Sequence, residues 1–410
     1  MKENLLFLSH RLPYPPNKGD KIRSYHLLRC LAERYNIFLG AFIDDPADRV
    51  HVDALRQWCA EVKVIDLNPR LAKLASLRGL WTDEALTLPY YRNASLFRWA
   101  KETVSQYRIS IAVAFSSAMA QFVPPDLTVR IMDMVDVDSD KWAQYAPTKP
   151  WPLSWLYRRE AKKLAGWECC IARDFNATLL VSGAEAAHLK RMAADAADKI
   201  DWFENGVDAD FFQPDPACPS PYAHGTTPIV FTGAMDYWPN IDAVTWFASE
   251  IFPRVRDAIP DAMFAIVGSN PSQAVKTLGA QPGVWVTGRV DDVRPYVQHA
   301  ACAIAPLRLA RGVQNKVLEA MAMARPVVTS PQAAEGISAQ AGENFLVADN
   351  AADFAAQVTA VCKGLFPDMG AQARARILLA YDWQTNLSRI LPHLEASRSS
   401  PAHESSSCLS

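Results

Sequence analysis

Short runs rich in Val, Ile, Leu and Phe alternate with longer amphipathic stretches through most of this sequence. A short apolar run followed by a longer helical pattern is the signature of a βα unit. Successive βα units build a mostly parallel sheet that is covered by helices. The alternation therefore predicts an α/β fold, and it constrains the chain more than its composition does.

The alternation is interrupted once, at a stretch dense in Pro, Gly and small polar residues (213–227), whose composition is typical of an interdomain linker. Because 410 residues exceed what one hydrophobic core usually covers, we expect two domains. The predicted architecture is two Rossmann-like domains, 1–212 and 228–380, facing a cleft. A helix at 381–396 is expected to pack back on the first domain, and the composition of 397–410 favours disorder.

The apolar runs locate the expected strands. They are 5–9, 36–43, 61–67, 109–115, 128–134, 177–182 and 199–203 in the first domain, and 228–234, 263–269, 284–290, 302–307, 325–330 and 344–349 in the second.

The net charge, the apolar runs and the cysteines indicate which partners and which cellular compartment to expect. A net charge of −2 gives no global attraction to nucleic acid, so none is expected as a partner. The apolar run 5–9 is too short for a signal peptide or a membrane span, and no later run reaches about 18 apolar residues. Eight cysteines lie scattered, without the spacing of a zinc site or a disulfide framework. We expect a cytoplasmic protein with reduced thiols.

Several motifs of common enzyme classes are missing from the sequence. It contains no dinucleotide GxGxxG, no P-loop, no HExxH and no GxSxG. The sequence therefore gives no motif-based support for four reaction classes: hydride transfer, P-loop nucleotide hydrolysis, zinc proteolysis and esterase chemistry.

An acidic stretch, "MDMVDVDSDKW", permits several interpretations. Asp136 and Asp138 fit the start of a calcium loop, but Lys141 replaces its glycine and Pro147 its last glutamate. The pair also matches the Asp-x-Asp of a class of metal-dependent sugar transferases. Carboxylates at the carboxyl end of a strand could instead bind a polar acceptor. A solvated acidic loop explains the stretch equally well.

The stretch "GVQNKVLEAMAMARPVVTS" (312–330) offers a ligand site at the start of a predicted helix. Lys316 and Glu319 are three residues apart and share a helix face. Free amides and the positive end of the helix dipole favour a phosphate there, with Lys316 as a cation. Glu319, one turn on, is suited to accept two hydrogen bonds from a ribose diol. By spacing alone, an ordinary surface ion pair is the simpler interpretation, so the surrounding sequence must decide.

Several ordered motifs resemble the two-domain, family-four retaining glycosyltransferases, the GT-B type, over residues 1 to about 395. "NKVLEAMAMARPVV" resembles their donor-binding helix and the following strand. "ENGVDADFFQP" (204–214) and "LLVSGAEAAHL" (179–189) resemble the end of their first domain. "FTGAMDYWPNIDAV" (231–244), "VGSNP" (267–271) and "VTGRVDDVRPY" (286–296) resemble the opening of their second domain and its base-binding loop. "HRLPYPPNKGDKIRSYH" (10–26) is most similar to the subfamily associated with exosortase and exopolysaccharide loci in bacteria.

The resemblance implies roles for particular residues. Lys316 and Glu319 would be catalytic, and the donor would also be bound by Gly19, Gly233, Arg289, Val290, Gly312, Val313, Gln314 and Asn315. Gly19 lacks a Cβ, and Lys18, Lys21 and Arg23 place cations around it. Six residues would serve the acceptor or act as auxiliary polar groups, namely His10, Lys21, Arg23, His26, Asp136 and Asp138. For each histidine a purely structural role is the alternative.

Three positions depart from the family pattern. The first glutamate of the family's two-glutamate motif is replaced by Arg311, which we assign to the catalytic set as a ligand for a phosphate or an acidic sugar. Ala324 stands where a glycine usually ends the donor helix, which argues against a left-handed cap. Asp236 stands where many relatives carry a cation for the diphosphate, so Lys316 would take over that duty.

The implied reaction moves a sugar from a nucleoside diphosphate to an acceptor hydroxyl with retention, without a metal or further cofactor. A sugar-nucleotide 2-epimerase of the same fold and a binding protein without catalysis are the alternatives. The segment 151–170 interleaves Trp151, Trp155, Leu156 and Trp167 with four cations, Arg158, Arg159, Lys162 and Lys163. Such a helix can lie on the inner face of the cytoplasmic membrane and serve a lipid-linked acceptor. A crossover helix with its aromatic residues in the core, and a saccharide acceptor, are the alternatives.

Overall fold

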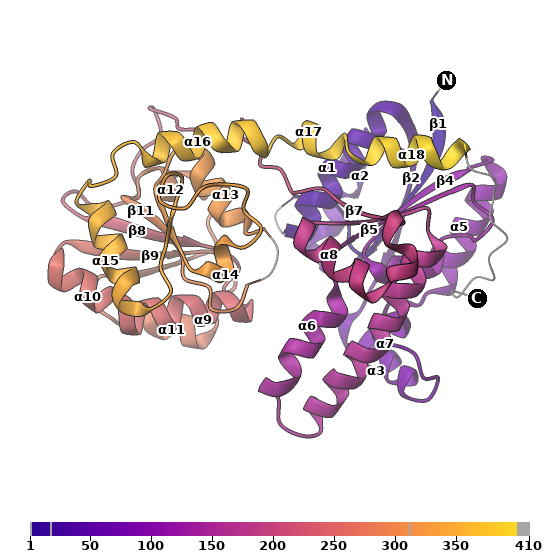
Figure 1. Cartoon of the computed structure of the whole chain (residues 1–410), viewed down its shortest axis with the longest axis horizontal. Helices are drawn as coiled ribbons and strands as arrows, with labels where there is room; N and C mark the ends of the chain where they lie inside the picture. The colour runs from indigo at the N-terminus through magenta and orange to yellow at the C-terminus, as the bar shows by residue number, and fades with distance from the viewer. Residues whose placement is uncertain (1, 17–18, 311–312, 400–410) are drawn as a thin grey trace. The chain divides into compact units, whose positions relative to one another are not determined.

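The computed structural model describes residues 2–16, 19–310 and 313–399, and these residues form two compact units (Figure 1). Unit 1 consists of the residues up to Glu204 together with those from Gln384 on, and unit 2 is Asn205–Trp383. Each unit has its own parallel sheet, as the alternation of the sequence predicts.

The sheet of unit 1 has seven strands in the order β3-β2-β1-β4-β5-β6-β7, all paired in parallel. Leu5 to Leu8 of the central strand β1 are fully buried because helices cover both faces. The strand order reverses between β1 and β4, where open α/β sheets bind their ligands. The strands are β1 (Glu3–Ser9), β2 (Tyr35–Ile43), β3 (Cys59–Asp66), β4 (Ile111–Phe115), β5 (Val129–Val135), β6 (Ala177–Leu180) and β7 (Ile200–Trp202).

Side-chain caps fix where several helices of unit 1 begin. The Asn93 side chain accepts hydrogen bonds from the amides of Ser95 and Leu96, and Asn68 caps a second helix whose first residue is Pro69. The helices of unit 1 are α1 (Gly19–Arg34), α2 (Val52–Leu55), α3 (Pro69–Ser76), α4 (Thr87–Tyr91), α5 (Ala94–Gln106), α6 (Asp138–Tyr145), α7 (Leu153–Asp174), α8 (Gly183–Met192) and α18 (Ile390–Ser399), with α17 (Trp383–Leu387) leading into the last.

The C-terminal helix α18 belongs to unit 1, as expected. His393 Nε2 lies 3.0 Å from Asp201 Oδ2. The Arg389 guanidinium lies 4.8 Å above the ring of Trp202. The helix continues to Ser399, beyond the predicted end at 396, and the rest of the predicted disordered tail (400–410) lies outside the described residues.

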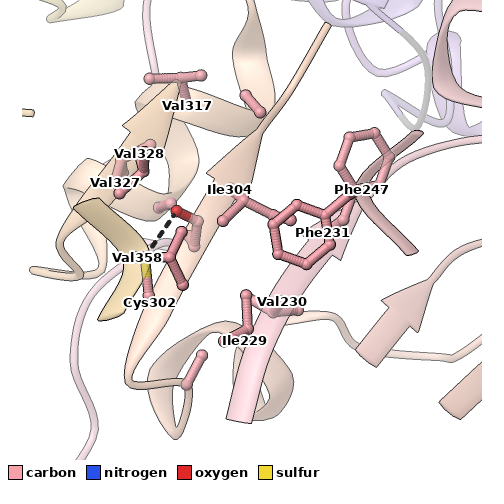
Figure 2. Close-up of a cluster of buried hydrophobic side chains, with 14 of the residues drawn as sticks. Ile229, Val230, Phe231, Phe247, Cys302, Ile304, Val317, Val327, Val328 and Val358 are labelled. Carbon is pink, nitrogen blue, oxygen red and sulfur yellow. Dashed lines mark hydrogen bonds between the residues drawn. The ribbon is translucent and has the colours of Figure 1, made fainter. Parts of the chain in front are cut away.

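Unit 2 has a sheet of six parallel strands in the order β10-β9-β8-β11-β12-β13. Side chains of the strands and of the helices meet in one apolar core, in which Phe231, Ile304 and Val317 are all buried (Figure 2). The strands are β8 (Thr227–Thr232), β9 (Ala262–Val267), β10 (Val284–Gly288), β11 (Cys302–Ala305), β12 (Val327–Thr329) and β13 (Leu346–Val347). The helices are α9 (Trp238–Trp246), α10 (Phe252–Ala258), α11 (Gln273–Leu278), α12 (Arg294–Gln298), α13 (Asn315–Ala322), α14 (Pro331–Ala334), α15 (Ala351–Cys362) and α16 (Met369–Ala380).

The predicted linker at 213–227 is wrong, because these residues pack on unit 2. Asp215 and Gln298 exchange two hydrogen bonds, from the Asp215 amide to Gln298 Oε1 (2.8 Å) and from Gln298 Nε2 to the Asp215 carbonyl (2.6 Å). The buried Tyr222 donates its hydroxyl to the Tyr296 carbonyl. A high content of Pro and Gly indicates the absence of regular secondary structure; it does not indicate the absence of packing.

The boundary between the units also lies earlier than the predicted residue 212. The Val207 amide donates to the Tyr381 carbonyl at 2.8 Å, and a Cβ at Gly206 would lie 2.6 Å from the Trp383 ring. These contacts fasten residues 205–212 to the end of unit 2. None of the helices in the described ranges combines the length and apolarity that a membrane crossing requires.

Candidate functional site

The carboxyl edge of the unit 2 sheet brings the end of β8 close to the start of α13. The strand order reverses between β8 and β11, and α13 follows β11 along the chain. Open α/β sheets bind ligands outside the carboxyl ends of their strands at such a reversal. The predicted donor helix therefore begins at the position in unit 2 where a ligand is expected.

Lys316, in the first turn of α13, is held by neutral groups. Its Nζ donates to Asn240 Oδ1 at 2.6 Å and lies 4.4 Å above the ring of Phe231. Asn240 is buried and is itself fixed by a hydrogen bond from Nδ2 to the Ala234 carbonyl. No described carboxylate lies within ion-pair distance of the ammonium group.

Burial changes the acid–base properties of both predicted catalytic residues. It lowers the pKa of Lys316 to about 7, against the opposing effect of Glu319. It raises the pKa of Glu319 to about 7, against the opposing effect of Lys316. An exposed surface ion pair would leave both groups well solvated, so the surface-pair interpretation does not describe this helix end. An anionic ligand beside Lys316 would restore the favourable environment of its charged form.

Two glycines shape the edge of the sheet beside Lys316. A Cβ at Gly233 would lie 2.8 Å from Asn240 Nδ2 and 3.3 Å from Lys316 Nζ. A Cβ at Gly268 would lie 1.6 Å from the carbonyl oxygen of Gly233, which no side chain can tolerate. Glycine is therefore required at both strand ends for the backbone to approach the lysine so closely.

The amide end of α13 contains three of the predicted donor-binding residues. Gln314 is the N-cap residue, and its side chain makes no capping hydrogen bond to the helix. Asn315 Oδ1 is buried and has no hydrogen-bond partner among the described residues, and Val313 packs against the core of unit 2. Free amides at a helix start favour an anion. Arg311 and Gly312, which precede this turn, lie outside the described residues.

The predicted base-binding residues Arg289 and Val290 directly follow β10 on the same edge of the sheet. The Arg289 side chain is exposed and contacts no described partner by hydrogen bond or ion pair, while Val290 packs against the core. Asp236, in the loop after β8, accepts a hydrogen bond from Asn270 Nδ2 at 3.2 Å.

Ala324 corrects one expectation about the donor helix. It adopts a left-handed conformation (φ 54°) although it is not glycine. The Arg325 amide bonds the Ala320 carbonyl and the Ala324 amide bonds the Met321 carbonyl, which is the hydrogen-bond pattern of a Schellman cap. The left-handed cap is thus formed, and the alanine carries a conformational cost of about 1 kcal/mol.

Two of the cations predicted near a donor phosphate are buried in ion pairs of unit 1. Lys21 is 1% exposed, and its Nζ lies 2.5 Å from Asp48 Oδ2. Arg23 is 0% exposed and donates hydrogen bonds to Asp133 from Nε (2.8 Å) and Nη2 (3.1 Å). Both side chains are neutralised inside the fold, so the structure corrects their assignment to a phosphate site. Gly19 is exposed at the start of α1, and Lys18 lies outside the described residues.

His10 lies at the end of β1, beside the reversal of strand order in unit 1. Its ring stacks on Phe115 of β4, and its Nε2 lies 3.3 Å from Asp20 Oδ2. Its Nδ1 is buried and has no hydrogen-bond partner in the described part of the chain. His26 is half-buried within α1, with its ring against Tyr25. Of the two predicted histidines, His10 has the position and the unused nitrogen that an auxiliary role requires.

The acidic stretch after β5 is neutralised by a neighbouring lysine. Lys141 Nζ donates to Asp136 at 2.7 Å and to Asp138 at 3.0 Å. Burial acts to lower the pKa of Lys141, but the two carboxylates raise it well above its usual value. Across the described ranges no three acidic, histidine or cysteine side chains are grouped as a metal site would require. The pair is better explained as part of a local ion network than as metal ligands.

The predicted membrane segment 151–170 divides into two parts. Trp151 and Trp155 are exposed, as a surface role requires. Trp167 packs against the core, and its indole donates to the Ser117 carbonyl, as the crossover-helix alternative requires. Arg159 binds the carbonyls of Gly79 and Glu84, and Lys163 pairs with Asp83, whereas Arg158 and Lys162 are exposed.

Sequence reasoning did not single out three residues of this site, namely Phe231, Asn240 and Gly268. All three lie inside the quoted motifs "FTGAMDYWPNIDAV" and "VGSNP". A glycine directly after an apolar run was the available signal for Gly268. The contacts of Phe231 and Asn240 with Lys316 join positions more than 70 residues apart, and a motif alone does not reveal such a contact.

Comparisons with known proteins agree with this geometry. Residues 226–363, within unit 2, match the family model described as Glycosyl transferases group 1. Among curated proteins, none matches the sequence.

Solved structures match the chain almost from end to end. Sucrose-phosphate synthase from Thermosynechococcus elongatus has a TM-score of 0.71 and 16% identity, covering 96% of this chain and 100% of that one. HepE from Anabaena, in complex with UDP and glucose, has a TM-score of 0.66 and 15% identity, covering 96% and 100%. WaaG, a glycosyltransferase involved in lipopolysaccharide biosynthesis, has a TM-score of 0.65 and 13% identity, covering 95% and 98%. The chain therefore has the GT-B fold of two parallel-sheet α/β domains.

Proposed function

We propose that the protein is a retaining glycosyltransferase that moves a sugar from a nucleoside-diphosphate donor to an acceptor hydroxyl. One observation carries the proposal. Lys316 lies at the carboxyl edge of the sheet in the unit that matches the glycosyl transferase group 1 model, and among the described residues only neutral groups contact its ammonium. A half-buried cation without a carboxylate partner can bind an anionic ligand, which would stabilise its charged form.

The donor would lie across the start of α13. Lys316 and the backbone amides at the start of α13, from Val313 to Asn315, would bind the diphosphate. Glu319, one turn along the same face, would accept hydrogen bonds from the ribose diol. The glycines at the ends of β8 and β9 let the backbone of these strand ends lie close to the lysine. Arg289 and Val290, after β10, would contact the base.

The chemistry follows from the bond that must break. The bond from the anomeric carbon to the diphosphate oxygen breaks first, leaving an oxocarbenium-like sugar and a developing negative charge on the phosphate. Lys316 and the helix amides stabilise that charge. The acceptor oxygen then attacks from the face that the diphosphate leaves, and its proton passes to the departing phosphate oxygen. This sequence gives retention and assigns the charge-stabilising task to the protein's own cation, without a metal.

The acceptor would be a saccharide or a lipid-linked sugar hydroxyl, in bacterial exopolysaccharide synthesis at the cytoplasmic face of the membrane. His10, with its unused Nδ1 at the strand reversal of unit 1, would be the auxiliary polar group on this side. The resemblance of "HRLPYPPNKGDKIRSYH" to the exopolysaccharide subfamily supports this part of the proposal.

The full-length protein incubated with UDP-, GDP- and ADP-sugars tests the proposal directly. Free nucleoside diphosphate that forms only when an acceptor is present supports transfer. An epimerised sugar without transfer would show a 2-epimerase, and binding without turnover would show a carrier of sugar nucleotides. Lys316→Met should lower the rate of product formation by about 100- to 1000-fold. Lys276→Met, which alters an exposed lysine of α11 in the same unit, is the matched control.

A further inference from the structure

Unit 1 exposes large apolar side chains on two segments that are distant in sequence. Trp81 is 90% exposed, Trp151 is 82% exposed and Leu74 is 66% exposed. Apolar patches of this kind on a soluble domain indicate an interaction surface. The exposed apolar residues of the two segments are Leu71, Leu74, Leu77, Leu80 and Trp81 in the first and Trp151, Leu153 and Trp155 in the second.

The two segments belong to one region of unit 1. Helix α3 runs directly into a short 3₁₀ helix (Leu77–Leu80), and the Gly79 carbonyl accepts a hydrogen bond from Arg159 Nη2 of α7 at 2.5 Å. Arg159 also binds the Glu84 carbonyl at 3.0 Å. Trp155 precedes Arg159 by one helical turn and shares its face. Figure 1 shows α6 and α7 extending together from the sheet, and they pack against each other.

Helix α3 turns its large apolar side chains toward solvent, which is the reverse of an ordinary surface helix. Leu71 and Leu74 face solvent, whereas the small Ala72 is the buried residue of the helix. A surface helix of a soluble domain normally turns its leucines inward. The outward leucines therefore need an apolar environment that unit 1 itself does not supply.

The same region carries cations without partners. The side chains of Arg70, Lys73, Arg78 and Arg158 are exposed and form no hydrogen bond or ion pair with any described residue. Residues 69–82 and 149–159 contain no Asp or Glu. Because the whole chain has a net charge of −2, this positive charge is a local feature. Leucines and tryptophans interleaved with unpaired cations match the apolar boundary and the anionic headgroups of a lipid surface.

We infer that residues 70–81 and 149–158 form a docking face that binds unit 1 to an anionic lipid bilayer. The apolar side chains enter the boundary between headgroups and acyl chains, while the four cations bind the headgroup phosphates. The inference rests on the proposed function only for its purpose, since a lipid-linked acceptor would be met at such a surface. Lipid binding itself is independent of the donor site in unit 2.

Co-sedimentation of the full-length protein with vesicles tests the docking face. Phosphatidylcholine vesicles are compared with vesicles that also contain phosphatidylglycerol. The wild type should sediment with the anionic vesicles, and added salt should weaken that binding. Replacing Arg70, Lys73 and Arg78 by Gln should reduce partition about 100-fold, since each cation near the surface contributes a factor of about 5.

A second variant tests the apolar part. Leu74→Ser with Trp81→Ser should reduce partition at least about 10-fold, because each removes a side chain that would be buried in the boundary. The matched control is Phe97→Ser with Arg98→Gln and Lys101→Gln, which removes an exposed aromatic residue and two exposed cations from α5 of the same unit. It should sediment like the wild type. All altered side chains are exposed, and thermal unfolding confirms that each variant is folded.

Three outcomes would overturn the inference. The wild type could fail to sediment with anionic vesicles, or both docking-face variants could bind as well as the control. Self-association that depends on Leu74 and Trp81, without vesicle binding, would assign the face to a second copy of the chain. Stabilisation by UDP is measured on the same samples. Its absence in the wild type would count against the proposed function and leave the vesicle result unchanged.

Discussion

Two regions of the molecule place lysine or arginine near a strand reversal, and they use these cations in opposite ways. In unit 1, Lys21 and Arg23 are fully buried and each faces a carboxylate, Asp48 and Asp133. In unit 2, Lys316 faces an asparagine oxygen and an aromatic ring. A cation neutralised by a carboxylate holds the fold together, whereas a cation satisfied by neutral groups keeps its charge available for a ligand.

The pKa of Lys316 reflects the absence of a carboxylate at hydrogen-bond distance among the described residues. The pKa of Lys316 falls to about 7 because burial is opposed only by the more distant Glu319. Such a lysine destabilises the folded state whenever the unfolded chain holds it protonated. The cost is complete below about pH 7, declines as the pH rises toward the unfolded pKa of about 10.4, and is absent above it. A bound diphosphate would remove the cost by stabilising the charged form.

The largest expected effect is on the stability of unit 1. Arg23→Met leaves the buried Asp133 without its partner and should lower the free energy of unfolding by about 3–5 kcal/mol. Burial already acts to raise the pKa of Asp133 above its usual value, and loss of Arg23 raises it further. The deficit should therefore grow as the pH rises through the folded-state pKa of Asp133 in the wild type, because above that pKa only the folded variant still holds the proton.

Denaturant unfolding at pH 5 and pH 7 measures this deficit. The exposed Arg98→Met on α5 is the control and should stay within about 0.5 kcal/mol of the wild type. A loss below about 1 kcal/mol in Arg23→Met would show that the pair does not stabilise the fold in the way described here.

The next effect is on catalysis. Lys316→Met should lower the transfer rate by about 100- to 1000-fold, because one charged donor to the departing diphosphate is lost. The stability of unit 2 should rise, since the variant no longer buries an ammonium without a carboxylate. Initial rates and thermal unfolding check the two halves of this prediction. A variant that loses stability and keeps its rate would show that Lys316 is structural.

Proton uptake on donor binding tests whether Lys316 becomes charged when the diphosphate binds, and it does so without a rate measurement. At pH 8 Lys316 is largely neutral in the free protein, given a pKa of about 7. Binding of UDP should raise that pKa and take up close to one proton, and Glu319 contributes little because it is already mostly ionised. Calorimetry in buffers of different ionisation enthalpy measures the uptake, and Lys316→Met should abolish it. Equal uptake in both proteins would assign the proton to another group.

The smallest effect concerns the cap of the donor helix. Ala324→Gly removes the cost of the left-handed conformation and should stabilise unit 2 by about 0.5–1 kcal/mol. Denaturant unfolding checks the sign. The activity should not change, because the cap lies at the far end of α13 from Lys316. A destabilised Ala324→Gly would contradict the described cap.

The sequence predicted the two parallel sheets and the position of α13 because apolar periodicity reports burial locally. It misplaced 213–227 because composition shows where regular structure stops, whereas the contacts of Asp215 and Tyr222 with α12 join segments more than 70 residues apart. The roles of Lys21 and Arg23 were missed for the same reason. A cation beside a glycine looks the same in sequence whether its partner is a phosphate or a carboxylate 110 residues later, as Asp133 is for Arg23.

Affinity for UDP, measured by calorimetry on the full-length wild type and on Lys316→Met and Lys21→Met, tests the central contrast most directly. GDP and ADP replace UDP if the wild type binds one of them instead. Lys316→Met should weaken binding by about 10- to 100-fold, the contribution of one hydrogen bond to a charged group. Lys21→Met should keep the wild-type affinity at a temperature where it remains folded. Intact affinity in Lys316→Met together with lost affinity in a folded Lys21→Met would contradict the account.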